Sequence, residues 1–380
     1  MNIILQDLEN HLTFAPLTFT RPVGNLRVGM FTNDERYKLY FPKAKVSYET
    51  EDYLSDKFPL KKEEDNYWIN GAVIPNEELV NLIQTIKIDE TLVVNGVFVC
   101  HRGAECSTEN KRYEALNSLI YMKERWNLYQ CNDIVLKADF AFYTKEKQSF
   151  ILSKSNILIG PEENLFIDEG ATIEGAIINV KDAPVYIGKN AEVMEGALIR
   201  GGLVLCDNAV LKMGAKSYGC TTIGPHCKVG GEVNNVIFHG YSNKGHEGFI
   251  GNSLIGEWCN IGADTNCSNL KNNYGTVKTH DYNLNQLEQT DVQFMGITMG
   301  DHAKTGINTM FNTATVIGVS ANVFGADFPP KYIPNFSWGG HKNAEKFDFD
   351  KSIEVANNMM IRRKTEMSSD DIKIFQKLYA

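Results

Sequence analysis

The chain has 380 residues, of which 43% are hydrophobic and 22% charged, and its formal net charge is −9. This length suggests two or three folded domains, and the composition excludes a mainly disordered chain. The acidic balance argues against a general binder of nucleic acid or anionic membranes, because such partners need a broad basic surface; a local basic pocket for a phosphorylated ligand is still compatible with it.

The N-terminal apolar run, Ile3 to Leu5, is too short for a secretory signal, and no stretch approaches the roughly 18 apolar residues of a membrane span. Eight cysteines are scattered without a C-x-x-C pair, which argues against a zinc site and favours reduced thiols. We therefore expect a cytoplasmic protein without a metal site of that type, and we expect none of its residues to be a metal ligand.

Residues 1–126 alternate between two kinds of pattern. The apolar segment 91–100 predicts buried strands, whereas 76–86 and 113–126 predict amphipathic helices, the first with Asn76 as its N-cap. Strands that alternate with helices favour an α/β domain over residues 1–126. Residues 127–150 would then be a linker to the next domain.

A period of six dominates residues 151–330. Apolar residues recur at this spacing, with Ser217 and Thr305 as polar exceptions in the same register: Ile187, Val193, Ile199, Leu205, Leu211, Ile223, Val229, then Phe249, Ile255, Ile261, Cys267, and Met299, Phe311, Ile317, Val323. A helix would space them by three and four, and a free strand by two. A period of six fits one short strand and turn, three to a coil, stacked as a hexapeptide-repeat parallel β-helix with a continuous core.

Two polar stretches interrupt the repeat, and a helical tail follows it. We expect residues 234–248 and 270–291 to leave the coils as loops, and loops of this length are often functional. Loops that leave a solenoid tend to gather on one side, so both could reach one cleft. The tail covers residues 331–380.

One loop carries a candidate for acid–base chemistry. His246 stands in a glycine-flanked segment, and histidine suits the removal of a proton from an attacking amine. Glu232 could orient the imidazole or hold the amine, and Asn260 and Asn269 offer neutral donors. Lys244, Lys271 and Lys278 could meet a phosphate. The alternative is that His246 caps a surface turn.

The order of these residues carries a resemblance. Glu232 is followed along the chain by Gly245–His246, Phe249, the N-I-G-A motif at 260–263 and Asn269, and the spacing from Glu232 to Asn269 matches that of a known family without a gap. Residues 150–330 thereby resemble the acetyltransferase half of the bifunctional bacterial family that joins glucosamine-1-phosphate acetyltransferase to N-acetylglucosamine-1-phosphate uridyltransferase. Phrases such as LTFTRPVGNLRVG and GYSNKGHEGF are more similar still to a Bacteroidetes-type variant family of sugar nucleotidyltransferases with hexapeptide repeats.

The resemblance implies a left-handed β-helix, a homotrimer with each active site between neighbours, and acetyl-CoA as co-substrate. It implies that His246 is the general base, with Glu232 beside it as the second catalytic residue. Sugar-phosphate contacts would come from Lys216, Asn234, Phe249, Asn260, Asn269 and Lys278, and acetyl-CoA contacts from Ala263, Gly300, Lys304, Thr305 and Gly306. The family has a tyrosine, a lysine and a phosphate-binding arginine where this chain has Phe249, Asn234 and, nearby, Lys216, so the sugar or its phosphate could be held differently.

The N-terminal domain resembles a reduced nucleotidyltransferase. The family's glycine-rich loop should follow the first strand, but no glycine precedes Gly24 here, and the Asn95–Gly96 pair lacks the following aspartate that would hold Mg²⁺. Arg21 and Arg27 are the basic residues nearest the expected nucleotide phosphates. Mg²⁺ is expected only if this domain is active.

Three functions stay open at this point. The first is an acetyl-CoA-dependent N-acetyltransferase of an amino-sugar phosphate. The second is a sugar-1-phosphate nucleotidyltransferase, with UTP or dTTP, that uses the β-helix to trimerise. The third is a non-catalytic scaffold that binds a sugar nucleotide.

Overall fold

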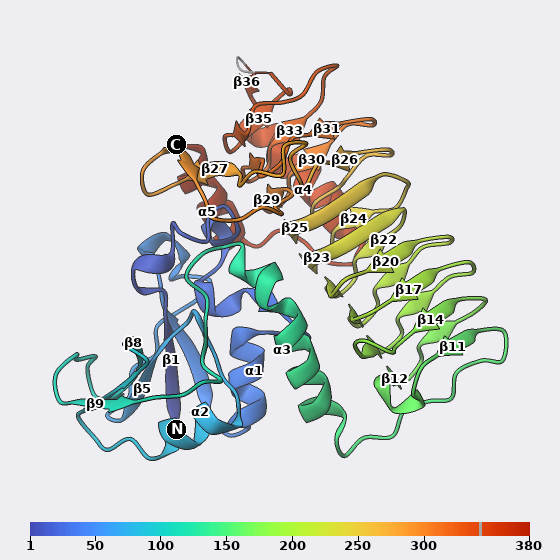
Figure 1. Cartoon of the computed structure of the whole chain (residues 1–380). Coiled ribbons are helices and arrows are strands. Elements are labelled where there is room, and N and C mark those ends of the chain that lie inside the picture. Colours follow the sequence, from blue (N-terminus) through green and yellow to red (C-terminus); the bar gives the residue numbers. More distant parts are fainter. Residues whose placement is uncertain (342–343) are drawn as a thin grey trace. The chain divides into compact units, whose positions relative to one another are not determined.

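The computed structural model describes residues 1–341 and 344–380, and the chain divides into two compact units (Figure 1). The first contains Met1–Arg27, Phe31–Asn127 and Ser369–Lys377, and the second contains Val28–Met30, Leu128–Ser368 and Leu378–Ala380. No helix among the described residues is long and apolar enough to cross a membrane.

The first unit is an α/β fold around a six-stranded mixed sheet. The strand order is β4-β1-β5-β8-β7-β9, with bounds β1 (Asn2–Gln6), β4 (Lys45–Glu49), β5 (Asn66–Asn70), β7 (Glu90–Val94), β8 (Val97–Gly103) and β9 (Lys111–Glu114). Two helices accompany it, α1 (Asn33–Tyr40) and α2 (Glu77–Gln84), and short pairs join β2 (Arg27–Val28) to β3 (Phe31–Thr32) and β6 (Val73–Ile74) to β10 (Ile120–Tyr121). The expected α/β class of the N-terminal region is confirmed.

Most of the elements expected in this unit are formed, but one of the two expected helices is replaced by strands. The Asn76 side chain caps α2 by accepting a hydrogen bond from the Leu79 amide at 2.9 Å. The helix expected over 113–126 is not formed: β9 pairs with β7 and β10 with β6, while Leu116 and Leu119 pack against the sheet core. By pairing with β7 and β6, the backbone N–H and C=O groups of β9 and β10 form the hydrogen bonds that a helix would otherwise have supplied.

The Asn95–Gly96 pair forms the turn of a hairpin. Asn95 has φ of 50° and Gly96 of 81°, and the two residues join the antiparallel strands β7 and β8. Asn-Gly favours such two-residue turns because both residues accept positive φ. The strand-end motif that would carry a metal-binding aspartate is therefore a structural turn in this chain.

The second unit is a parallel β-helix whose coils stack in chain order (Figure 1). Its first face contains β11 (Ile157–Ile159), β14 (Ile177–Asn179), β17 (Leu198–Arg200), β20 (Lys216–Tyr218), and the first residues of β23 (Glu232–Gly240) and β25 (Phe249–Glu257), with β26 (Asn266–Cys267) and β31 (Met310–Phe311) paired beyond them. Its second face contains β12 (Leu165–Ile167), β15 (Val185–Ile187), β18 (Leu203–Leu205), β21 (Thr221–Ile223), the later residues of β23 and β25, β29 (Thr298–Met299), β32 (Val316–Ile317) and β34 (Tyr332–Ile333).

The third face completes each coil. It contains β13 (Thr172–Ile173), β16 (Glu192–Val193), β19 (Val210–Leu211), β22 (Lys228–Val229) and β24 (Asn243–Lys244), then β30 (Lys304–Thr305), β33 (Asn322–Val323) and β35 (Ser337–Trp338). The last strand of this sheet, β36 (Glu345–Lys346), pairs antiparallel with β35. Asn260 bridges the two groups by pairing with Asn243 and Lys304. The coil strands continue past residue 330, where the β-helix was expected to end.

Three helices flank these strands in sequence. Residues 127–150, expected as a linker, contain the helix α3 (Asn127–Thr144), whose Asn132 donates to the Cys220 carbonyl of the β-helix at 2.7 Å. The expected C-terminal helices are α4 (Phe349–Ile361) and α5 (Ser369–Tyr379). Because α3 packs along the coils, it is part of the second unit rather than a free connection.

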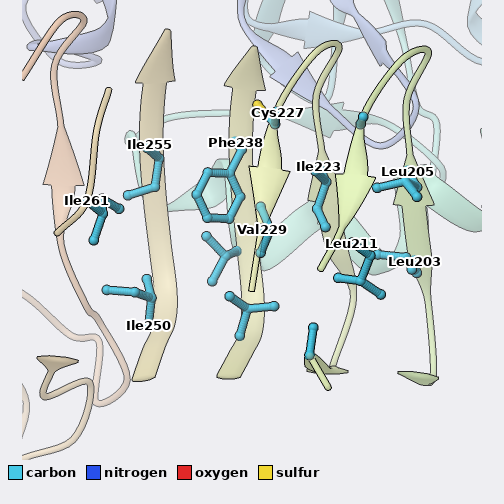
Figure 2. Close-up of a cluster of buried hydrophobic side chains, with 14 of the residues drawn as sticks. Leu203, Leu205, Leu211, Ile223, Cys227, Val229, Phe238, Ile250, Ile255 and Ile261 are labelled. Carbon is cyan, nitrogen blue, oxygen red and sulfur yellow. The ribbon is translucent and has the colours of Figure 1, made fainter. Parts of the chain in front are cut away.

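The interior of the β-helix is a column of apolar side chains from successive coils (Figure 2). Residues of the period-six pattern such as Ile223, Val229 and Ile255 are fully buried there. One residue of that pattern is misplaced: Ile250 is the buried side chain and Phe249 lies on the outside. Since adjacent strand residues face opposite sides, this single step of register turns Phe249 toward solvent.

Only one of the two expected loops leaves the coils. Residues 234–248 continue the coil through β23 and β24, so the loop expected there is wrong; its polar residues sit among inward-facing Val236 and Phe238. Residues 270–291 do leave the coil and carry the hairpin of β27 (Lys278–Asp281) and β28 (Gln286–Gln289). The chain returns beside its exit, where Leu270 pairs with Phe294.

Two inward polar residues should respond oppositely to removal of the hydroxyl. Ser217 is buried and its hydroxyl makes no hydrogen bond within the described residues, whereas the Thr305 hydroxyl accepts from the Gly262 amide at 2.9 Å and lies 3.0 Å from that of Thr265. An unsatisfied buried hydroxyl costs about 1–3 kcal/mol, and a satisfied one contributes about 1 kcal/mol. Ser217→Ala should raise the free energy of unfolding, and Thr305→Val should lower it, in denaturant titrations; shifts of the same sign would contradict this assignment.

Candidate active site

The first face of the β-helix brings several predicted site residues into register. Lys216 pairs with Glu232, and Glu232 with Phe249, in three successive coils. Tyr218, Asn234 and Gly251 form the parallel column two residues further along each strand. Because alternate residues of a strand share one face, both columns lie on the outer surface.

The Glu232 carboxylate has one polar partner in this cluster. The Tyr218 hydroxyl donates a hydrogen bond to Oε1 of Glu232. Burial, and then this hydrogen bond, raise the pKa of Tyr218 to about 12, so the phenol stays protonated and keeps donating at neutral pH. Glu232 is thereby held as an oriented acceptor.

Phe249 and Asn269 lie together over Gly251. A Cβ placed on Gly251 would lie 2.6 Å from Cζ of Phe249 and 2.8 Å from Nδ2 of Asn269. The same Nδ2 donates to Oδ1 of Asn252 at 2.7 Å. The absence of a side chain at Gly251 therefore makes room for the ring and the amide to sit beside the Glu232 column.

His246 stands at the corner between the third and first faces, next to Glu232. Its carbonyl lies over Gly231 of the preceding coil, and the Glu232 amide donates to the Gly248 carbonyl at 3.2 Å. The imidazole is exposed and makes no hydrogen bond within the part of the chain that the structure describes. It is thus open to a substrate bound on the first face.

A buried lysine holds this corner in place. Nζ of Lys244 donates to the carbonyls of Gly230 and His246, both at 2.9 Å, and the residue is 1% exposed. Burial lowers the pKa of Lys244 to about 8, which leaves it mostly protonated at neutral pH. The expectation that Lys244 could meet a phosphate is therefore wrong, because its ammonium group is buried and ties the backbone of His246 to the coil beneath it.

A cavity of about 1130 Å³ adjoins the cluster. Lys216, Glu232 and Asn234 line it, as do Arg200 and residues of α3 such as Lys137. Nζ of Lys216 lies 3.7 Å from Oε2 of Glu247, but both side chains are solvent-exposed, and such a pair is weak enough for a phosphate to displace. Arg200 pairs with Tyr218 in register and adds a third cation to the two lysines of this cavity.

Other predicted site residues lie elsewhere on the second unit. Asn260 and Lys304 are neighbours on the third face, and Gly306 packs against Gly262, next to Ala263. Gly300 belongs to the same stretch of coil as Lys304. The Thr305 hydroxyl is used inside the coil, so it cannot face a ligand.

Lys278 is separated from the Glu232 column within this chain. It begins the β27–β28 hairpin, and its carbonyl accepts from Nζ of Lys331 at 3.2 Å. The neighbouring Thr279 donates to the Ala314 carbonyl, so the hairpin packs on later coils. This chain alone does not place Lys278 beside Glu232.

The two arginines expected to bind a nucleotide are buried in the first unit. Arg21 is 5% and Arg27 6% exposed, and Nη2 of Arg27 lies 3.4 Å from Oε2 of Glu35. The loop after β1 is instead organised by Asp7, which accepts from the Val23 amide at 2.7 Å. Both arginines are therefore enclosed rather than displayed to solvent.

Sequence reasoning missed three members of the first-face cluster, Tyr218, Glu247 and Arg200. Tyr218 and Arg200 carry a usable signal, since each lies two residues past an outward position of its strand, as Asn234 does past Glu232. Glu247 could not be found in this way, because its pairing with Lys216 depends on the path of the corner.

Comparison with known proteins supports the resemblance. Residues 3–148 match a family model described as sugar nucleotidyl transferase. Relatives named bifunctional protein GlmU include those of Trichodesmium erythraeum (27% identity, 36% of this chain, 25% of the relative), Methanocaldococcus jannaschii (33%, 23%, 21%) and Corynebacterium jeikeium (26%, 46%, 40%). The resemblance to GlmU-like proteins is confirmed. The chain spans only about a fifth to two fifths of these relatives' lengths.

Solved structures give a weaker similarity. The polySia specific acetyltransferase NeuO is 11% identical, covers 56% of this chain and 95% of its own, and has a TM-score of 0.24. The UDP-N-acetylglucosamine acyltransferase of Arabidopsis is 14% identical, covers 58% and 85%, and has a TM-score of 0.26.

A methyl group at Gly251 should disturb the cluster without unfolding the coil. In Gly251→Ala the new Cβ would push aside the Phe249 ring and the Asn269 amide, whose ends are flexible. We expect the KM for the sugar phosphate that the resemblance implies to rise at least about tenfold, since small misplacements of site groups are costly. Gly240→Ala is the matched control, because its Cβ would meet nothing closer than 3.4 Å. An unchanged KM in Gly251→Ala, with equal melting temperatures, would remove Phe249 and Asn269 from the site.

Proposed function

We propose that this protein is an acetyl-CoA-dependent N-acetyltransferase that acts on an amino-sugar phosphate, with His246 as general base. The observation that carries the proposal is the in-register cluster of Lys216, Glu232 and Phe249 beside the exposed His246 imidazole. The cluster combines a cation, an oriented carboxylate and an aromatic face with a base at one place on the coil surface.

The chemistry assigns a task to each group. The substrate amine attacks the thioester carbonyl carbon of acetyl-CoA, the carbon–sulfur bond breaks, and the amine proton passes to His246 and then to the departing thiolate. Glu232, fixed by Tyr218, accepts a hydrogen bond from the amine or a hydroxyl. Asn269 donates to sugar oxygens, and Lys216 and Arg200 attract the phosphate.

The acetyl-CoA contacts and part of the sugar contacts are proposed for a different face. Asn260 and Lys304 lie on the third face, whereas Glu232 and Phe249 lie on the first. Within one chain these two groups of side chains point outward from different faces, so a ligand centred on the first face is turned away from Asn260 and Lys304. A homotrimer in which the third face of one copy approaches the first face of the next removes this conflict.

The trimer can be tested directly. Light scattering on the purified chain should return three times the mass of one chain at micromolar concentration. A monomer that retains full acetyl transfer would show that each chain holds a complete site and would contradict this arrangement.

Removal of the base should affect turnover rather than binding. In His246→Ala we expect kcat for acetyl transfer to fall by ~10²–10⁴-fold, with the affinity for acetyl-CoA unchanged, because a general base acts mainly in the transition state. His341→Ala, which also removes an exposed imidazole, is the control. Near-full transfer by His246→Ala to every amino-sugar phosphate tried would defeat the mechanism.

The second candidate is sugar-1-phosphate nucleotidyl transfer by the first unit, and the family match over residues 3–148 favours it. Against it stand the turn at Asn95–Gly96 and the burial of Arg21 and Arg27. With no exposed cation among these arginines and no aspartate after Gly96, triphosphate and Mg²⁺ lose their expected ligands.

We therefore expect little Mg²⁺-dependent release of pyrophosphate from UTP or dTTP with any sugar 1-phosphate. Robust release would reverse this ranking. Arg21→Lys and Arg27→Lys would then be compared, since substitutions that keep the charge separate phosphate binding from packing.

A further inference from the structure

A second pocket, of about 420 Å³, lies on the third face of the β-helix under the helix α4. Lys228, Asn243, Asn260 and Lys304 pair in register there, so they form one outward column. At ~4.8 Å for each step between strands, the two lysines stand about 14 Å apart, with both asparagines between them. Val355, Asn358, Met359, Arg362 and Arg363 of α4 and the turn after it close the other side.

The charges of this pocket are unbalanced. Its lining includes four cations, Lys228, Lys304, Arg362 and Arg363, and no carboxylate. Within the described residues, none of the four makes an ion pair. Burial, followed by repulsion from Arg363, Lys212 and Arg362, lowers the pKa of Lys228, with only Glu192 acting in the other direction.

The simplest structural explanation covers part of this cluster. Arg362 and Arg363 follow the last turn of α4, where a cation interacts favourably with the helix dipole. That effect does not account for Lys228 and Lys304, which belong to the coils and face the same space. Cations from two separate elements converge here at a cost in mutual repulsion, and a bound anion would remove that cost.

Neutral groups in the pocket also suit an anion. Nδ2 of Asn243 donates to Oδ1 of Asn260 at 3.0 Å, which orients the Asn260 amide with its own Nδ2 free to donate. Nζ of Lys304 is anchored to the His302 carbonyl at 2.8 Å, and burial lowers its pKa to about 8. Tyr241 and Trp258 stack on each other 4.2 Å apart and make a rigid wall, with their faces already occupied.

We propose that this pocket binds a phosphate or diphosphate group, held by Lys228, Asn260 and Lys304 of the coils from one side and by Arg362 and Arg363 from the other. The stacked ring faces leave no slot for a base, so recognition is of the anion itself. The volume suits a diphosphate with part of its carrier. The identity of the molecule that carries this group rests on the proposed function. Two substrates of that reaction bear phosphate: acetyl-CoA, which contains a diphosphate, and the amino-sugar phosphate.

The first test uses inorganic pyrophosphate, so it does not depend on catalysis. Calorimetric titration of the full chain at low salt should show binding that weakens as salt rises. In R362Q/R363Q the affinity should fall at least about tenfold, while R362K/R363K should keep most of it. K181Q/K189Q removes the same charge from exposed coil positions and should bind like the parent.

The second test identifies the carrier. Coenzyme A is compared with pantetheine, and glucosamine 1-phosphate with glucosamine, on the parent and on R362Q/R363Q; the pair whose difference disappears in the variant names the source. No binding of pyrophosphate by the parent, or equal binding by a folded R362Q/R363Q, would overturn the proposal. Failure of the proposed acetyl transfer would give a different result: His246→Ala would keep near-full transfer activity, while the parent would still bind pyrophosphate.

Discussion

The register in which one coil stacks on the next determines everything else in the second unit. Ser217, Val233 and Ile250 point into the coil in successive turns, and strand alternation then forces their neighbours outward. A shift of one residue would bury Glu232 and expose Ile250, at a cost of several kcal/mol for a desolvated carboxylate. The same apolar column that stabilises the β-helix therefore sets the spacing of the candidate active site.

The sequence could predict the β-helix because its signal repeats, and each coil tests the period again. The six-residue period predicts the wrong inward residue at Phe249. Strand β25 passes from the first to the second face without a turn, so the step from the inward Ile250 to the inward Ile255 is five positions instead of six. The prediction for residues 234–248 failed for a related reason. Glycine and asparagine favour a loop locally, but outward positions of a coil tolerate polar residues, and the inward Val236 and Phe238 keep the segment in register.

Only the part of the candidate site that follows a recognisable order along the chain could be predicted from the sequence. Glu232, His246, Phe249 and Asn269 could be found from their order, whereas Tyr218 and Arg200 join them through pairing between coils. Asn260 was expected in the same site, yet it lies on the third face with Lys304. The order of the motif residues does not by itself say which face each of them occupies, so a motif whose spacing matches in sequence is divided between two faces in space.

The turn that carries His246 is held by a buried lysine, Lys244, and burial of its ammonium group lowers the stability of the fold. An ammonium group inside a β-helix loses its hydration, and its lowered pKa means that the unfolded chain binds the proton more tightly than the folded one between about pH 8 and the ordinary lysine range. Stability therefore rises with pH across that window, and below it the charged group is a standing cost. Two carbonyls offset part of that cost, and one belongs to His246. A methionine would fill the same space without the penalty but could not bond to that carbonyl, so the lysine exchanges stability for a fixed path of the chain at the proposed base.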